Sequence, residues 1–153
     1  MFINSEKSRI KEIISDFFKK GGFEVSIEIL SSEDGVVLAK IKTDEPKILI
    51  GQSGQTMIEI QHLLRIIIKK SLKEEIKFDL DINDYKKKKI EYLKDTARTV
   101  ADEVFLSKKD KELDPMPSYE RRIIHMELAN RSDVLTESIG EGESRRIIVK
   151  AKQ

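Results

Sequence analysis

The first forty residues pass from a helical pattern to a strand pattern. In residues 5–20, the apolar side chains from Ile10 to Phe18 follow the i, i+3, i+4, i+7, i+8 spacing of one helical stripe. Apolar and polar residues then alternate over Phe23–Ile29, and the run VVLAKIK follows at 36–42 after an EDG turn. The pattern predicts a helix followed by two antiparallel strands.

A second helix and a third strand follow. Pro46 closes the second strand or starts a short helical turn, and Gly51 and Gly54 interrupt the chain after it. Helical spacing then predicts a helix over 55–72, and alternation over Ile76–Ile82 predicts a strand.

From Asn83 onwards the pattern changes to continuous helix. Asn83 can act as the N-cap of a long helix, so we place a module boundary there, with one module at 1–82 and the next at 83–153. The predicted buried face of this helix consists of Ile90, Leu93, Ala97, Val100, Ala101 and Val104.

The C-terminal part predicts an extended piece, a helix and a hairpin. Pro115 and Pro117 exclude a helix interior, and Ser118 can cap a helix that runs to about Ala129. Strands are expected at 134–139 and 145–151, with Gly140 or Gly142 supplying the positive φ of the turn. The predicted fold class is α+β, with two small α/β modules.

Composition narrows the function. Hydrophobic residues make up 39% and charged residues 37%, and no apolar run reaches the roughly 18 residues of a membrane helix, so we expect a cytoplasmic protein without membrane insertion. Cysteine is absent and histidine occurs twice, so we expect no metal site, and no cofactor is indicated. The net charge of +1 does not by itself indicate a nucleic-acid partner.

The glycine pair in ILIGQSGQT has two chemical interpretations. A P-loop needs Gly-Lys-[Ser/Thr], and no lysine follows either glycine, so that interpretation fails. The other is a clamp in which the missing Cβ atoms let a sugar-phosphate backbone approach main-chain N–H groups at the start of helix 55–72. A helix C-cap followed by a turn remains an alternative without a ligand.

Helix, strand, strand, apolar KILI, G-x-x-G, helix and strand together resemble a type II KH domain (α-β-β-α-α-β around a three-stranded sheet). The resemblance implies a clamp for single-stranded nucleic acid with Ile48 and Ile50 on its apolar floor. Gln52 and Ser53 are neutral where many KH loops are basic, so positive charge must come from elsewhere, and Lys47 and the lysines at 86–89 are candidates. The lysine run also fits a solvated helix face. The implied clamp residues are Ile48, Ile50, Gly51, Gln52, Ser53, Gly54 and Gln55.

Arg121 and His125 lie four residues apart on a predicted helix, so they share one face. Arginine can bind phosphate through two N–H groups, and a neutral imidazole can donate one hydrogen bond or stack on a base. A surface arginine beside a half-buried histidine with its hydrogen bonds satisfied is the alternative.

The stretch YERRIIHMEL, preceded by a long helix and followed by a hairpin with RRIIV, resembles the R-3-H domain, which is named for Arg-x-x-x-His. The resemblance implies the order α-β-α-β-β and binding of single-stranded nucleic acid by Arg121 and His125. Arg122, Arg145 and Arg146 are basic candidates for the same face.

A KH module followed by an R-3-H module resembles the bacterial Jag family, also called KhpB or SpoIIIJ-associated proteins. The resemblance implies an RNA chaperone or post-transcriptional regulator that acts on single-stranded RNA and is linked to cell-wall synthesis and cell shape. It also implies a small single-KH protein as partner; single-stranded DNA is a further ligand of the same kind. The chain begins at the KH helix, so we expect no N-terminal Jag domain.

Two other classes of function are an enzyme and a protein-interaction scaffold. His62 and His125 occur without a G-x-S-x-G, H-E-x-x-H or D-x-D-x-D-G frame, so we expect no enzyme and assign no catalytic residue. A protein-interaction scaffold, including a homodimer, is the stronger rival because KH surfaces also make protein contacts.

Overall fold

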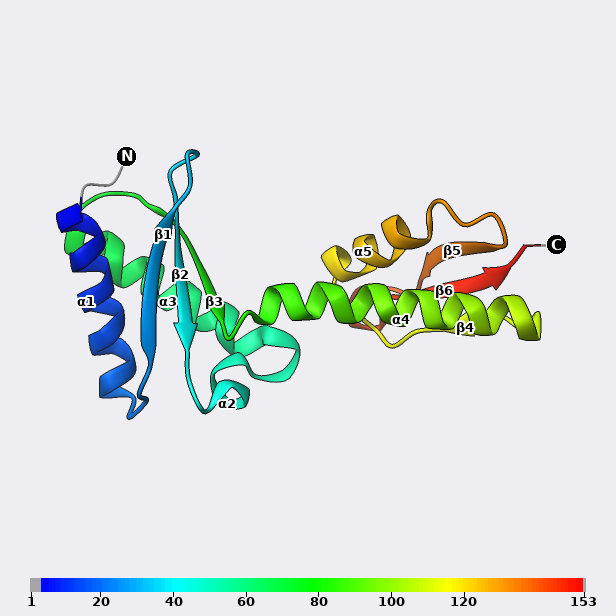
Figure 1. The fold of residues 1–153 in the computed structure, drawn as a ribbon, viewed down its shortest axis with the longest axis horizontal. Helices are drawn as coiled ribbons and strands as arrows, with labels where there is room; N and C mark the ends of the chain where they lie inside the picture. Colours follow the sequence, from blue (N-terminus) through cyan, green and yellow to red (C-terminus); the bar gives the residue numbers. More distant parts are fainter. Residues whose placement is uncertain (1–3, 153) are drawn as a thin grey trace. The chain divides into compact units, whose positions relative to one another are not determined.

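The structure, a computed structural model of the chain, describes residues 4–152. The chain divides into two units, Met1–Lys86 and Lys87–Gln153. Each unit has its own three-stranded sheet (Figure 1) and its own buried core, so the predicted α+β class is confirmed.

The first unit has the element order α-β-β-α-α-β. Its elements are α1 (Asn4–Lys20), β1 (Ser26–Ser31), β2 (Val36–Lys42), α2 (Pro46–Ile50), the 3-10 turn η1 (Gln52–Gly54), α3 (Gln55–Leu72) and β3 (Lys77–Ile82). The amphipathic spacing has the expected result: α1 buries Ile10, Ile14 and Phe18 against the sheet, and α3 buries Leu64 and Ile68 beside them.

The first sheet has the order β1-β2-β3. β1 runs antiparallel to β2, as a tight turn dictates, whereas β2 and β3 are parallel because α2 and α3 form the crossover between them. Ile29 pairs with Ala39, and Ala39 with Leu80, on the face that the helices cover. Lys40 belongs to the alternate set of side chains, on the face away from this core.

The second unit follows the order α-β-α-β-β. Its elements are α4 (Tyr85–Ser107), which begins in the last residues of the first unit, β4 (Lys111–Glu112), α5 (Ser118–Leu128), β5 (Val134–Ile139), the 3-10 turn η2 (Gly142–Ser144) and β6 (Arg146–Ala151). The sheet order is β4-β6-β5, with antiparallel pairs throughout. Leu93 and Ala97 of α4 and Ile124 of α5 cover one face of this sheet, over Ile147 and Val149.

Several local predictions were wrong. Asn83 does not cap α4: it has φ 50°, and its amide group exchanges two 2.9 Å hydrogen bonds with the backbone of Thr43. Ser118 is the first residue of α5, and Pro117 occupies the cap position. Ile90 is 40% exposed and lies outside the buried face of α4.

Candidate nucleic-acid interface

The glycine pair forms a tight link between α2 and α3. Gly51 ends α2 with φ 71°, and its N–H donates to the Lys47 carbonyl over 3.0 Å. Gly54 immediately precedes α3 in the left-handed conformation, with φ 80°. Both positions therefore favour glycine for conformational reasons.

Contacts within the chain also require these glycines. A Cβ atom on Gly51 would lie 2.1 Å from Thr56 Oγ1, and a Cβ atom on Gly54 would lie 2.9 Å from Tyr85 Cε1. Gly54 is buried, and Gly51 is half-buried. The sequence alone suggested that a ligand backbone needs this space, but internal packing is sufficient to explain both glycines.

The residues between and beside the glycines are open to solvent. Gln52, Ser53 and Gln55 are exposed, and the Gln55 side chain donates to Glu59 Oε1 over 3.1 Å. Ser53 has φ 53°, a conformation that costs a residue with a Cβ atom about 1 kcal/mol. The turn thus presents two neutral side chains in a strained backbone.

The two predicted floor residues differ in exposure. Ile48 of α2 is 60% exposed, and its side chain is free to contact a ligand. Ile50 is half-buried and packs against the first core. Ile48 is therefore the better candidate for an apolar contact with a base.

The lysines expected to supply positive charge are not equivalent. Lys86 forms an ion pair with Asp79 at 2.5 Å, and Lys89 lies 3.7 Å from the carboxylate of Glu120. Lys47, Lys87 and Lys88 are exposed and form no ion pair with any residue in the range 4–152. Of these three free lysines, Lys47 lies in the first unit, whereas Lys87 and Lys88 belong to the second.

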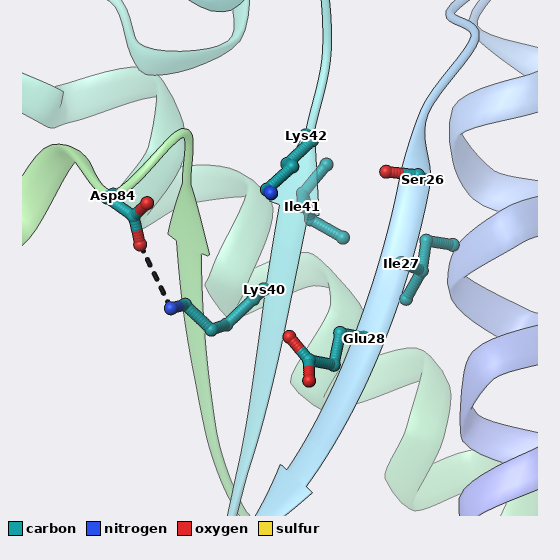
Figure 2. A pocket seen from close by; sticks show the side chains of 7 residues that line it. All are labelled: Ser26, Ile27, Glu28, Lys40, Ile41, Lys42 and Asp84. Carbon is teal, nitrogen blue, oxygen red and sulfur yellow. Dashed lines mark ion pairs between the residues drawn. The ribbon is translucent and has the colours of Figure 1, made fainter.

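A hollow on the open face of the first sheet is electrically balanced. Figure 2 shows Lys40 reaching from β2 to Asp84, an ion pair of 2.9 Å, with Glu28 of β1 on the other side. Lys42 is the remaining cation of this hollow. Since two carboxylates face two ammonium groups, this hollow is not an anion site.

In the second unit, Arg121 and His125 lie one helical turn apart on α5, as predicted. The Arg121 guanidinium is half-buried, and its Nη1 donates to the Met116 carbonyl over 2.6 Å. This bond holds one terminal nitrogen of the guanidinium, and its other N–H groups are the donors that could bind a phosphate.

His125 packs against β5 through both ring nitrogens. Nδ1 lies 2.7 Å from Thr136 Oγ1, and Nε2 lies 3.0 Å from Ser138 Oγ. Burial, and to a lesser extent the charge of Arg121, lowers the pKa of His125. The imidazole is therefore kept neutral, and a ring nitrogen could bind a ligand only by releasing one hydroxyl.

The remaining predicted arginines do not all lie on the same face as Arg121 and His125. Arg122 is exposed on α5, and Arg145, just before β6, is exposed with Nη1 3.4 Å from the Gly140 carbonyl. Arg146 forms an ion pair with Glu112 at 2.6 Å. In the β5–β6 register Ser138 pairs with Ile147, so Arg146, one residue away, points to the opposite face of the sheet from His125. The expectation that Arg146 shares that face was wrong.

Sequence reasoning missed the residues that hold the candidate side chains in place. Val134, Thr136 and Ser138 occupy every second position of β5, on the face that the helices cover. Polar residues at these inward positions were the signal that the sequence offered for partners of His125. Glu120, next to Arg121, is 3% exposed and accepts a hydrogen bond of 3.0 Å from the Tyr119 hydroxyl. No sequence pattern indicated that Tyr85 contacts Gly54.

Two further features concern residues 4–152. Within this range no three side chains of His, Cys, Asp or Glu are grouped as metal ligands would be. The helices of the same range are all too short or too polar to cross a bilayer.

Comparison with known proteins agrees with this architecture. Residues 91–151 match the family model of the R-3-H domain. Proteins named RNA-binding protein KhpB are 35% identical in Clostridium symbiosum over 130 residues (85% of this chain) and 33% identical in Bacillus subtilis over 115 residues (74%). The namesake of Lactiplantibacillus plantarum is 35% identical over 111 residues, or 72% of this chain.

These matches cover only part of each relative, namely 58%, 55% and 34% of the C. symbiosum, B. subtilis and L. plantarum proteins. They nevertheless extend over most of the present sequence, and the Arg121–His125 helix lies within the R-3-H match. The chain therefore belongs to the KhpB family, which is also called the Jag family.

Proposed function

We propose that this protein binds single-stranded RNA and that each unit contributes one contact surface. The first surface is the glycine turn with Ile48, Gln52, Ser53 and Gln55; the second consists of Arg121, Arg122, His125 and Arg145. The relatives named as RNA-binding proteins support the ligand class, and single-stranded DNA is a secondary ligand of the same chemistry.

The observation that carries the proposal for the first unit is the exposed turn ahead of α3. Gln52 and Ser53 are open to solvent at the N-terminus of an 18-residue helix, where backbone N–H groups and the helix dipole favour phosphate. The α-β-β-α-α-β order and the parallel β2–β3 pair support the assignment of this unit as a type II KH domain.

The similarity to the KhpB family extends the proposal to the cellular role of the protein. We place the protein in the cytoplasm as an RNA chaperone or post-transcriptional regulator whose targets affect cell-wall synthesis and cell shape. No step of this role requires an enzymatic residue.

The test is the double variant Gln52→Asp/Ser53→Asp, measured for affinity to a short single-stranded RNA. Two carboxylates on the turn would repel phosphate, so we expect binding to fall by at least tenfold, or about 1.4 kcal/mol. Gln52→Asn/Ser53→Asn is the matched control, because asparagine has the shape of aspartate and also tolerates positive φ. Equal affinity of the two double variants would contradict the proposal for the turn.

A protein-interaction scaffold is the second candidate, and one observation favours it. Leu63, Ile66 and Ile67 of α3 are 50%, 45% and 39% exposed and lie on one side of that helix. A stripe of this kind suits a second copy of the chain or a small single-KH protein. Light scattering of the full chain tests it: an Ile66→Lys variant whose mass equals that of the wild type at every concentration would remove this stripe as a homodimer surface.

A further inference from the structure

Tyr85, the first residue of α4, lies against the glycine turn although it is distant in sequence. Beside the hypothetical Cβ of Gly54, the nearest atoms are Tyr85 Cε1 at 2.9 Å and Cζ and Oη at 3.4 Å. Gly54 is buried while Ser53 and Gln55 on either side are exposed. The aromatic ring therefore fills the space beside the one residue of the turn that solvent does not reach.

The turn needs such support because its backbone is strained. Ser53 and Gly54 are consecutive residues in the left-handed region, with φ 53° and 80°. The hydrogen bonds that close the turn are few: the Gly54 N–H donates to Gly51 O over a long 3.4 Å, and the Gln55 N–H donates to Gln52 O. Strained conformations persist only where surrounding structure holds them.

Tyr85 is itself fixed on both sides. Before it, Asn83 is bonded to Thr43 in both directions, and Asp84 forms an ion pair with Lys40 (Figure 2). After it, the Lys86 N–H donates to Asp81 Oδ1 over 3.2 Å, and the Lys86 ammonium group contacts Asp79. The ring also packs against the first core. Its position is thus set by the sheet and not by the turn.

We propose that Tyr85 is a positioning residue for the RNA-binding turn: its ring holds Gly54 in the left-handed conformation and so keeps Gln52 and Ser53 presented to a phosphate backbone. This inference rests on the proposed function for its consequence in binding. Its structural part, the ordering of the turn, is independent of any ligand.

The structural part is tested by amide hydrogen exchange of the free full-length protein. In Tyr85→Ala, we expect faster exchange at Gly54 and Gln55, because the turn loses its support and opens locally. The amide of the fully buried Leu80 on β3, which donates to Gln61 Oε1 over 3.0 Å, is the internal reference and should exchange as in the wild type. If the alanine variant unfolds, Tyr85→Leu replaces it in the exchange measurement.

The functional part is tested by affinity for the same single-stranded RNA. Tyr85→Ala should weaken binding about tenfold, or about 1.4 kcal/mol. Tyr85→Phe keeps the ring and should bind and exchange like the wild type. Tyr92→Ala is the matched control: Tyr92 is also on α4 but is 62% exposed.

The outcomes separate the two proposals. Unchanged exchange at Gly54 and Gln55 in Tyr85→Ala overturns the positioning role, and so does a Tyr85→Phe variant that loses as much as the alanine variant. A wild-type protein that binds no RNA overturns the proposed function, while the exchange measurement still decides whether Tyr85 orders the turn.

Discussion

The ring of His125 and the hydroxyl of Thr136 are hydrogen-bonded, with Nδ1 2.7 Å from Oγ1. Ser138 provides the same contact to Nε2 over 3.0 Å. A neutral imidazole has one donor and one acceptor, and each hydroxyl can take either role, so one tautomer satisfies both contacts. The arrangement ties α5 to β5, and it disfavours the imidazolium because burial and Arg121 oppose a second positive charge.

The first prediction concerns the pH dependence of stability. The pKa of His125 is lowered from its usual 6.5, so the unfolded chain takes up a proton more readily than the folded one. The free energy of unfolding should therefore be at its full value above pH 6.5 and decrease as the pH falls through 6.5 towards the folded pKa. Urea denaturation followed through NMR signals of α5 measures this.

Two histidine variants test whether the pH dependence of the unfolding free energy comes from His125. His125→Gln should flatten the profile near pH 6.5, because the variant lacks the imidazole whose pKa folding lowers. His62→Gln is the matched control, since His62 is the other histidine and is exposed on α3. A profile that persists in His125→Gln would contradict the assignment.

The second prediction compares alanine at Gly51 of the glycine turn with alanine at Gly35, a glycine in open space. Gly35→Ala places a side chain at φ 74° in open space, so it should cost about 1–2 kcal/mol of unfolding free energy from conformation alone. Gly51→Ala has a similar φ of 71° but a ψ of −173°, a combination that is almost restricted to glycine, and it also places the new Cβ 2.1 Å from Thr56 Oγ1. It should cost roughly 1–3 kcal/mol more than Gly35→Ala. Equal urea midpoints would contradict the extra cost assigned to the backbone of Gly51 and to its contact with Thr56.

The third prediction concerns Arg131, which joins α4 to β5. Its Nη1 lies 2.6 Å from Asp102 Oδ1, and its Nε and Nη2 bind both oxygens of Asp133. The hydrogen bonds from Arg131 lower the pKa of Asp133 to about 2. Stability from this pair is present above the ordinary pKa of 3.8 and is lost as the pH falls from 3.8 towards 2.

The Arg131→Gln variant should therefore have a lower melting temperature at pH 7 and a flatter loss of stability between pH 3.8 and 2. The control is Arg98→Gln, because Arg98 pairs with Glu127 but is itself 57% exposed. Exposed ion pairs contribute little, so its melting temperature should fall less. The reverse order of the two variants would contradict the role assigned to Arg131.

Most of the fold could be predicted from periodicity. Helix 55–72 and the strands at 36–42 and 134–139 have the expected bounds because each is amphipathic along its whole length. Asn83 was misassigned because its partner Thr43 is 40 residues away, and a cap signal describes only local bonds.

The candidate site could be located but not explained from sequence. Spacing placed Arg121 one turn from His125, since a helix fixes that relation. The glycines were found by pattern, but their physical reason lies in Thr56 and Tyr85, which only the folded chain brings against them. Arg145 and Arg146 were grouped on one face, although consecutive residues of a strand point to opposite faces and Arg146 alternates with the buried Ile147.

The last prediction tests the second proposed surface. If Arg121 contacts the RNA backbone, Arg121→Ala should weaken binding by a similar factor for all sequences and reduce the salt dependence of log K by about 0.7 for one lost phosphate contact. Arg146→Ala is the matched control, because that guanidinium is engaged with Glu112 on the opposite face of the sheet and should be dispensable. Fluorescence anisotropy with several oligonucleotides at several salt concentrations measures both. A change in base preference alone would assign Arg121 to a base, and an equal loss in Arg146→Ala would mean that binding follows net charge and not this face.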